Sequence, residues 1–231
     1  MTGALRVGVV GHTGRLGSAV ERAALAAGHE VVARVTRTRR EVDAAPTVVI
    51  DAGHPAGLDR TLDLCRPTAA ALVYCVSAYD ERHEELLRDY ARVAPVTLAT
   101  NLARGHWLQV ELVRLAAELV GAAPDVAVAV HDRHPRTKAD RPSRTARELA
   151  RTWHAASGIA CTDVSSRRTG GPVSTHTVEI DLAGEQVTVS HDVTDLDAAA
   201  RSAVTVAAWL VQQHPGLHHH HDALRPTRSA P

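Results

Sequence analysis

The chain has 231 residues, a formal net charge of +0 and a hydrophobic fraction of 45%, which suits one large domain or two small ones. The balanced charge argues against nucleic-acid binding, because nucleic-acid-binding proteins usually carry a basic excess. No N-terminal stretch combines a basic end with a long apolar run, and no segment is apolar over the ~18 residues of a membrane span. We therefore expect a cytoplasmic protein with neither a membrane nor a nucleic acid as partner.

The first predicted element is an apolar strand over Leu5–Val10, and a helical pattern follows over Ser18–Ala27. Strand, glycine turn and helix form the context of a dinucleotide-binding fingerprint, in which glycines let the backbone approach a pyrophosphate at the helix N-terminus. The spacing is G-x-x-G-x-x-G rather than G-x-G-x-x-G, so a tight turn without a ligand is the alternative. The candidate cofactor contacts in this turn are Gly11, Thr13, Gly14, Arg15, Leu16 and Gly17.

The second predicted strand, Glu30–Val35, ends in a basic segment. In folds that prefer NAD, an acidic residue near the end of this strand binds the ribose 2′-hydroxyl. Here Thr36–Arg40 is rich in arginine, and the first acid is Glu41. An arginine such as Arg37 suits a 2′-phosphate, so the sequence favours NADPH, with NADH as the alternative cofactor. A solvated basic loop is the competing interpretation.

Further strands alternate with helices in the N-terminal half. The strands are predicted over Thr47–Asp51, Ala70–Val76 and Pro95–Thr100, and the intervening helices over Ala56–Arg66 and Ser77–Ala91. This alternation predicts a doubly wound parallel sheet, in which ligands bind beyond the carboxyl ends of the strands. The candidate cofactor contacts at those ends are Asp51, Ala52, Cys75, Ser77 and Asn101.

The second half of the chain has a different pattern. Its predicted elements are the helix Trp107–Val120, the strand Asp125–Val130, the helix Ser143–Ala156, a polar glycine-rich segment Ser165–Gly171, a hairpin of Ser174–Ile180 and Glu185–Asp192, and the helix Asp197–Val211. The tail from Pro226 is predicted to be disordered. We therefore predict an α/β protein with an N-terminal Rossmann-like, doubly wound parallel sheet and an α+β unit with a mixed, open sheet.

Lys138 is the only lysine of a chain that otherwise uses arginine. An ammonium group is a compact donor whose pKa can be tuned, whereas a guanidinium stays protonated. Lys138 lies in a polar stretch, His134–Ala146, close to Asp140, Ser143 and Thr145. This stretch predicts a polar site, and a chance lysine on a solvated loop is the alternative.

Several short motifs follow one another along the chain: Gly11–Gly17, Val49-Ile50-Asp51 with Pro55, Asn101 with Gly105, His134 with Lys138–Ala146, Arg168-Thr169-Gly170, His176-Thr177-Val178 and Ala207–Leu210. Together they resemble dihydrodipicolinate reductases over essentially the whole chain. The resemblance implies a dinucleotide-binding domain of residues 1–105 and 195–231, and a substrate-binding and oligomerisation domain of residues 106–194. It also implies a homotetramer built through the open sheet, and hydride transfer from NAD(P)H to an imine that bears two carboxylates.

The resemblance assigns roles to three residues of the polar stretch. His134 corresponds to the family's proposed catalytic acid, and Lys138 to a lysine that protonates or binds the substrate. Thr145 corresponds to a threonine that holds a substrate carboxylate. The chemistry suits these residue types, because hydride addition to C=N or C=C needs a proton at the other end. A cation, a hydroxyl and helix N–H groups can fix a carboxylate.

The chain departs from the family pattern around the predicted substrate. Pro135 stands where the family has a second histidine, and Arg144 replaces the glycine before the substrate threonine. Cys75–Ala78 replaces a Gly-Thr-Thr-Gly loop, which stiffens the segment expected to contact nicotinamide and substrate. We therefore predict a retained catalytic pair in a remodelled pocket. The predicted substrate contacts are Ser77, Ser143, Arg144 and Thr145.

Several functions remain open at this point. The favoured one is an NAD(P)H-dependent reductase of a small cyclic imine or unsaturated carboxylate, with a place outside lysine synthesis, in secondary metabolism, left open. The alternatives are dihydrodipicolinate reduction for lysine biosynthesis, a non-redox dehydratase, cyclase or lyase, and a binding protein without turnover. We predict no metal site, because the cysteines lack metal-like spacing and the run His218–His221 is interpreted as a surface segment. His176 is interpreted as a structural strand residue.

Overall fold

The structure is a computed structural model that describes residues 3–99, 101–121, 123, 125–170 and 174–224. It divides into two compact units, Met1–Leu102 with Leu196–Pro231, and Ala103–Asp195. The predicted disorder of the tail from Pro226 lies outside the described residues. Within the described ranges, no helix is both long and apolar enough to cross a membrane.

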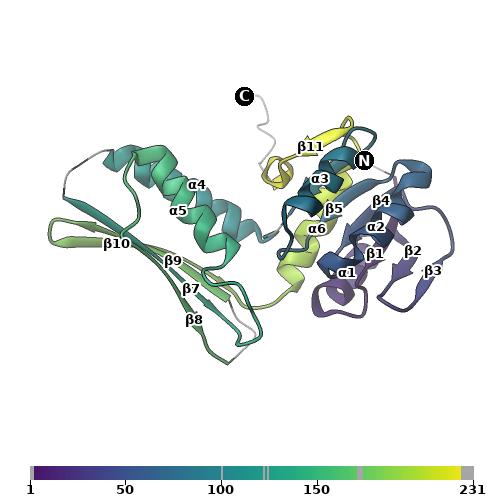
Figure 1. Ribbon diagram of the computed structural model, residues 1–231, viewed down its shortest axis with the longest axis horizontal. Helices are drawn as coiled ribbons and strands as arrows, with labels where there is room; N and C mark the ends of the chain where they lie inside the picture. The colour runs from purple at the N-terminus through teal and green to yellow at the C-terminus, as the bar shows by residue number, and fades with distance from the viewer. Residues whose placement is uncertain (1–2, 100, 122, 124, 171–173, 225–231) are drawn as a thin grey trace. The chain divides into compact units, whose positions relative to one another are not determined.

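A seven-stranded sheet forms the centre of the first unit (Figure 1). Its strands are β1 (Arg6–Val10), β2 (Glu30–Val35), β3 (Arg40–Val42), β4 (Val48–Asp51), β5 (Ala71–Tyr74), β6 (Pro95–Leu98) and β11 (Gly216–His218). They are ordered β11-β6-β5-β4-β1-β2-β3, and every neighbouring pair is parallel except β2 and β3. β4 and β5 are buried throughout, as expected for strands covered on both faces. The predicted Rossmann-like sheet is confirmed.

Helices cover both faces of this sheet. They are α1 (Arg15–Ala26), α2 (Leu58–Cys65), α3 (Glu81–Tyr90) and α6 (Asp197–Leu210), with 3-10 turns η1 (Pro55–Gly57), η2 (Arg66–Thr68) and η3 (His220–Leu224). Leu62 of α2 and Leu87 of α3 share a core with strand residues such as Leu72. On the other face α1 and α6 pack against each other, and they bury small residues such as Ala24 and Ala203.

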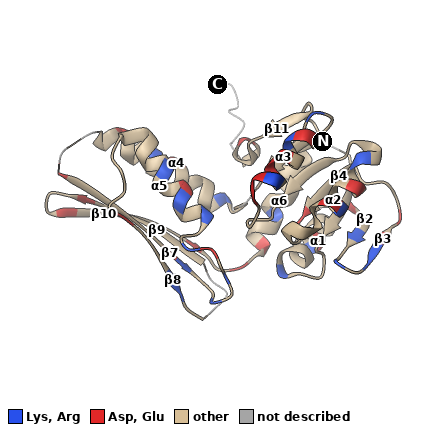
Figure 2. Ribbon diagram, in the orientation of Figure 1, with Lys and Arg blue, Asp and Glu red and all other residues tan. Residues whose placement is uncertain are grey.

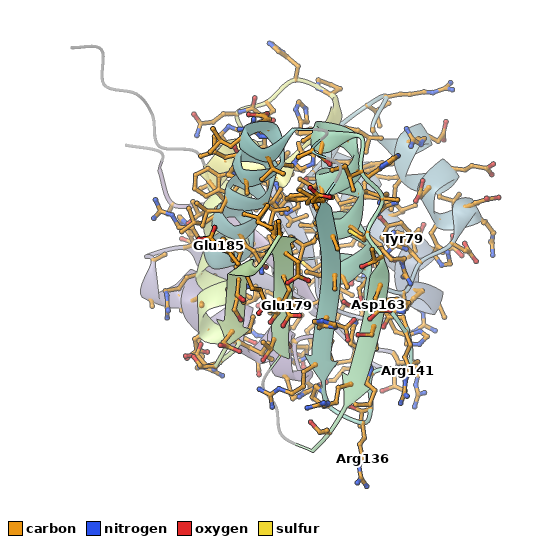
Figure 3. The ribbon with its side chains drawn as sticks, turned by 90° about the vertical axis from the view of Figure 1, so that its left-hand side faces the viewer. Tyr79, Arg136, Arg141, Asp163, Glu179 and Glu185 are labelled. Atoms are coloured by element: carbon orange, nitrogen blue, oxygen red, sulfur yellow. The ribbon has the colours of Figure 1, made fainter. Side chains whose placement is uncertain are left out.

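The second unit has a four-stranded mixed sheet, as predicted. Its elements are α4 (Arg104–Val120), β7 (Val126–His134), α5 (Arg144–Ser157), β8 (Asp163–Arg168), β9 (Ser174–Leu182) and β10 (Glu185–Val193). The strand order is β10-β9-β7-β8, with β8 parallel to β7 and the other pairs antiparallel. Both helices lie on one face, where Trp153 shares a core with Val130 and Ile180. The opposite face is polar and carries Glu179 (Figure 3).

Strand β7 alternates strictly, and every second residue from Val128 to His134 is buried. Val128 and Val130 belong to the apolar core. Because side chains two residues apart share one face of a strand, Asp132 and His134 continue that core face to the end of the strand. The same backbone that builds the core therefore positions these polar side chains.

Some predicted boundaries are wrong. The predicted strand Asp125–Val130 continues to His134, because the alternation persists with polar residues at the buried positions. The polar segment Ser165–Gly171 was not expected to form a strand, yet its first residues belong to β8. The edge position of β8, with one neighbouring strand, explains why its sequence lacks an apolar run. The short strands β3 and β11 were also not predicted.

The interpretation of His218–His221 as an exposed segment is wrong for its second half. His220 and His221 are buried. The Nε2 atom of His220 lies 3.0 Å from the carbonyl oxygen of Asn101. The segment is held in place because β11 adds to the edge of the sheet beside β6.

The glycine turn gives a first test of the fold. A Cβ atom at Gly17 would overlap the carbonyl group of Gly11, so Gly17→Ala should force the turn apart. Overpacking of this kind costs about 1–3 kcal/mol, and we expect urea unfolding to show a loss of that size. Gly57→Ala is the matched control, because a Cβ at Gly57 meets no atom within 4 Å. Equal stability of the two variants would contradict the tight turn.

Candidate active site

The glycine turn brings helix α1 directly to the end of β1. Gly11 has φ 76°, and a Cβ there would lie 2.7 Å from the carbonyl oxygen of Ala52. The Gly14 N–H donates to the Gly11 carbonyl at 2.8 Å. Helix α1 starts without a side-chain cap and without an acidic residue in its first turn. The first N–H groups of α1 therefore have no side-chain acceptor among the described residues, and the turn has the features of a pyrophosphate-binding turn.

The predicted contacts within this turn differ in their exposure. Thr13, Gly14 and Arg15 are exposed, Gly11 and Leu16 are half-buried, and Gly17 is buried. Thr13, Gly14 and Arg15 are thus open to solvent, whereas Gly17 acts through its missing side chain, which lets α1 approach the turn.

Arg37 lies on an exposed turn after β2, in a region where basic residues gather (Figure 2). The Thr36 hydroxyl holds this turn by accepting from the Arg39 N–H at 2.9 Å. The guanidinium of Arg60, from α2, donates to the carbonyl of Arg37. Arg39 forms an ion pair with Glu41 at 2.5 Å. Arg60 is a basic neighbour of this turn that the sequence alone did not reveal.

Asp51 ends β4 with its carboxylate directed into the protein. It accepts from the Thr61 hydroxyl at 2.7 Å and from the Gly53 N–H at 2.8 Å. Burial raises the pKa of Asp51, and these two hydrogen bonds oppose the rise. Through these bonds Asp51 fixes the start of the segment that leads to α2. Ala52 follows it and is half-buried.

The remaining predicted cofactor contacts follow neighbouring strands of the same sheet. Cys75 and Ser77 come after β5, Asn101 comes after β6, and all three are half-buried. The carboxyl ends of parallel strands meet at one edge of a sheet, so these residues share that edge with the glycine turn. Burial raises the pKa of Cys75, with nearby Asp51 adding to the effect. A thiol in this state is no nucleophile at neutral pH.

In the second unit, a buried ion pair joins the ends of β7 and β8. The Arg168 guanidinium lies 2.5 Å from an oxygen of Asp132, with side chains 2% and 0% exposed. Arg168 also donates to the carbonyl oxygens of Lys138, at 3.2 Å, and of Asp140. One side chain therefore holds the loop between β7 and α5. Arg136 and Arg141 of that loop lie at this end of the sheet (Figure 3).

The second oxygen of Asp132 fixes the start of α5. It accepts from the Ser143 N–H at 2.6 Å, while the Ser143 hydroxyl caps the helix by accepting from the Ala146 N–H at 3.1 Å. Burial acts to raise the pKa of Asp132, but the hydrogen bonds from Ser143 and Arg168 outweigh it and lower the pKa. Ser143 is thus a helix cap, as the sequence predicted, and its hydroxyl is already engaged.

His134 and Lys138, the predicted catalytic pair, lie beside this ion pair and helix cap. His134 is buried at the end of β7, and its Nε2 lies 3.1 Å from Nε2 of His176 on β9. Burial, together with the charges of Lys138 and Arg168, lowers the pKa of His134 to about 4. The Lys138 ammonium lies 2.9 Å from the Asp140 carboxylate and is 23% exposed. At neutral pH the site therefore holds a neutral imidazole beside the ion pair of Lys138 and Asp140.

Arg144 and Thr145 form the first turn of α5. The Arg144 N–H donates to Asp140 at 3.3 Å, and Thr145 is buried. The structure thus brings His134, Lys138, Ser143, Arg144 and Thr145 together at one end of the second unit, whereas Ser77 belongs to the first unit. Arg168 and His176 are the contacts to which the sequence assigned no role in the site. Arg168 was visible only as a member of a motif, and His176 was interpreted as a structural strand residue.

Comparison with known families identifies the class of protein. The family model described as dihydrodipicolinate reductase, N-terminus, matches residues 5–102, and that described as dihydrodipicolinate reductase, C-terminus, matches residues 105–224. The chain belongs to the dihydrodipicolinate reductase family. It is therefore a pyridine-nucleotide-dependent oxidoreductase of the kind that reduces C=N or conjugated C=C bonds. The resemblance seen in the motifs is confirmed.

Individual relatives agree with this family. The 4-hydroxy-tetrahydrodipicolinate reductase of Gluconobacter oxydans (strain 621H) is 29% identical and covers 95% of this chain and 97% of the relative. That of Sulfurovum sp. (strain NBC37-1) is 28% identical and covers 95% and 98%. A dipicolinate-bound dihydrodipicolinate reductase from Paenisporosarcina sp. TG-14 has a TM-score of 0.65 at 18% identity, covering 94% of this chain and 97% of that structure. At that identity the structure shows a shared fold.

The buried ion pair gives a prediction on stability. Arg168→Met leaves the Asp132 carboxylate buried without its cation, a change that costs about 3 kcal/mol or more. We expect a lower urea midpoint for the second unit, followed through the tryptophan fluorescence of the Trp209→Phe background, in which the remaining tryptophans, Trp107 and Trp153, both belong to that unit. Arg167→Met, at the exposed neighbouring position, should stay within about 0.5 kcal/mol of the wild type. A similar small effect at both positions would show that the pair does not hold the loop.

Proposed function

We propose that this protein transfers a hydride from NADPH to a C=N or conjugated C=C bond of a small cyclic substrate that carries carboxylate groups. The observation that carries the proposal is the arrangement at the end of β7. A charged lysine, a neutral histidine and the N-terminus of α5 lie together there. Hydride addition creates negative charge at the other end of the reduced bond, and this group of residues suits both that charge and a carboxylate.

We assign proton delivery to Lys138. The lowered pKa of His134, about 4, leaves that imidazole neutral at neutral pH, so it cannot supply the proton, and the ammonium of Lys138 is the neighbouring donor. An arginine holds its proton too tightly for this role, which explains a single lysine in a chain of arginines. Asp140, paired with Lys138 at 2.9 Å, keeps the ammonium oriented. His134 then serves as a hydrogen-bond donor, unless a bound dicarboxylate raises its pKa.

Carboxylate binding is assigned to the first turn of α5. The partial positive charge of the helix N-terminus attracts an anion there, and the Thr145 hydroxyl and the Arg144 guanidinium add donors of the kinds that carboxylates accept. The Ser143 hydroxyl caps the helix, so we assign Ser143 an indirect role in holding this turn.

The dinucleotide is assigned to the first unit. NADPH would meet the N-terminus of α1 with its pyrophosphate, and it supplies the hydride. Arg37 would meet the 2′-phosphate, with Arg60 fixing its backbone. Ala52, Cys75, Ser77 and Asn101 line the edge of the sheet beyond the strands, where a nicotinamide binds in Rossmann-like folds.

The substrate is proposed to differ in part from that of the relatives named 4-hydroxy-tetrahydrodipicolinate reductase. Pro135 offers no side-chain donor and Arg144 adds a charge, so the donors around the substrate have changed. We propose a homotetramer through the outer face of the second unit's sheet, on the strength of the family resemblance. Comparing NADPH oxidation with 4-hydroxy-tetrahydrodipicolinate and with cyclic imino monocarboxylates decides the substrate. Turnover without cofactor oxidation would instead support the non-redox alternative.

Lys138→Met tests the proton donor. A positioned general acid contributes ~10²–10⁴-fold to the rate, so we expect kcat for NADPH oxidation to fall by at least about 100-fold. Lys138→Arg should not restore it, because a guanidinium retains its proton. The control is Arg136→Met, at an exposed position of the same loop, which should leave kcat close to that of the wild type. Near-normal kcat in Lys138→Met would remove Lys138 from the mechanism.

Arg37→Ala tests the cofactor preference. A hydrogen bond to a charged group contributes about 1.5–3 kcal/mol, so the Kd for NADPH should rise about 10-fold or more. The Kd for NADH should stay unchanged, because NADH lacks the 2′-phosphate. Arg92→Ala, an exposed arginine near the end of α3, serves as control. If both cofactors weaken equally, Arg37 does not read the 2′-phosphate.

A further inference from the structure

Four imidazoles lie close together in the second unit, on four different elements. His134 is on β7, His176 on β9, His191 on β10 and His106 on α4. The ring centroids of His134 and His176 are 5.0 Å apart, and His176 lies 6.4 Å from both His106 and His191. The proposed chemistry uses only His134. His176, which is 2% exposed, is buried in the middle of the group without an assigned role.

His134 and His176 meet through the same type of nitrogen. Their Nε2 atoms are 3.1 Å apart, a distance at which one must donate and the other accept. A neutral imidazole has one N–H and one lone pair. Two arrangements are therefore possible, and they leave opposite tautomers on His134.

The second nitrogen of His176 decides between these arrangements. Its Nδ1 is buried and has no hydrogen-bond partner among the described residues. If His176 accepted at Nε2, this Nδ1 would carry a buried N–H without an acceptor, which proteins rarely tolerate. If His176 donates at Nε2, its Nδ1 is a bare lone pair. The doubly protonated form is excluded at neutral pH, because burial and the neighbouring His134, His106 and His191 lower the pKa of His176 to about 3.

We propose that His176 is a positioning residue, whose Nε2–H donates to Nε2 of His134 and thereby fixes His134 as the Nδ1–H tautomer. The Nδ1–H is then the group of His134 that remains for the substrate. This inference rests on the proposed function, in which His134 lies beside the reduced bond. A fixed N–H donor selects hydrogen-bond acceptors, so this side of the substrate should present a carboxylate or another oxygen or nitrogen lone pair.

The surrounding contacts hold the backbone of His176 in place. The buried Gln109 side chain of α4 donates to the carbonyl oxygen of His176 at 2.7 Å and to that of Val189 at 3.1 Å. His176 is also in register with Asp132 of β7 and His191 of β10. Asp132 is itself fixed by Arg168. The point of the backbone from which the imidazole projects is therefore fixed by both neighbouring strands.

Long-range 1H–15N correlation of the histidine rings tests the assignment on the full chain, with the His134 signals identified from their loss in His134→Gln. We expect Nδ1 of His134 to be protonated and Nε2 to be bare. His176→Leu should abolish this preference and lower kcat about tenfold or more, since a positioned donor is lost. His176→Gln, whose amide can donate in place of Nε2–H, should retain the tautomer and most of the rate. The matched control His191→Gln should leave both unchanged.

The outcomes separate this inference from the proposed function. Finding Nε2–H on His134 in the wild type, or an unchanged His134 tautomer in folded His176→Leu, overturns the inference. Should the tautomer respond to His176 while the wild type reduces no imine or unsaturated carboxylate, the inference holds and the proposed function fails.

Discussion

The buried ion pair between Asp132 and Arg168 is the interaction on which the second unit of this protein depends. Arg168 bonds Asp132 and the carbonyl oxygens of Lys138 and Asp140. The other oxygen of Asp132 holds the N–H of Ser143 at the start of α5. Because both charges are withdrawn from water, each depends on the other for compensation. The end of β7, the loop between β7 and α5, and the first turn of α5 are therefore held together by this one ion pair.

The same charges set the protonation of the site. Burial beside Lys138 and Arg168 keeps His134 neutral, with a pKa near 4, and Asp140 is held ionised by Lys138. In the proposed mechanism, proton donation therefore falls to the lysine, and hydrogen bonding falls to the imidazole. A negatively charged substrate would offset the positive charges of Lys138 and Arg168 and so raise the pKa of His134. Binding of such a substrate and protonation of His134 would therefore be coupled.

Sequence reasoning was most successful where the signal is local. The glycine turn, the parallel strands, the Ser143 cap and the β9–β10 hairpin all follow from residues close together in the chain. It failed where a distant partner supplies the stability. β8 has no apolar pattern of its own and forms because it pairs with β7. Paired residues of the two strands, such as His134 and Arg168, are 34 positions apart in the sequence. His176 and His134 are likewise brought together by the pairing of β9 with β7. They are far apart in the sequence, so no local sequence pattern predicts their contact.

Pro135 and Arg144, the two positions of this loop that depart from the family pattern, hold the loop through their backbone atoms. The carbonyl of Pro135 accepts from the Lys138 N–H at 3.1 Å, and the N–H of Arg144 donates to Asp140 at 3.3 Å. Any residue at position 135 supplies that carbonyl, and any residue except proline at position 144 supplies that N–H. The side chains there can therefore change without loosening the loop that carries Lys138. In contrast, Asp132, Arg168 and Ser143 act through their side chains and leave little room for exchange. The proposed change of substrate would therefore leave the position of Lys138, the proposed proton donor, intact.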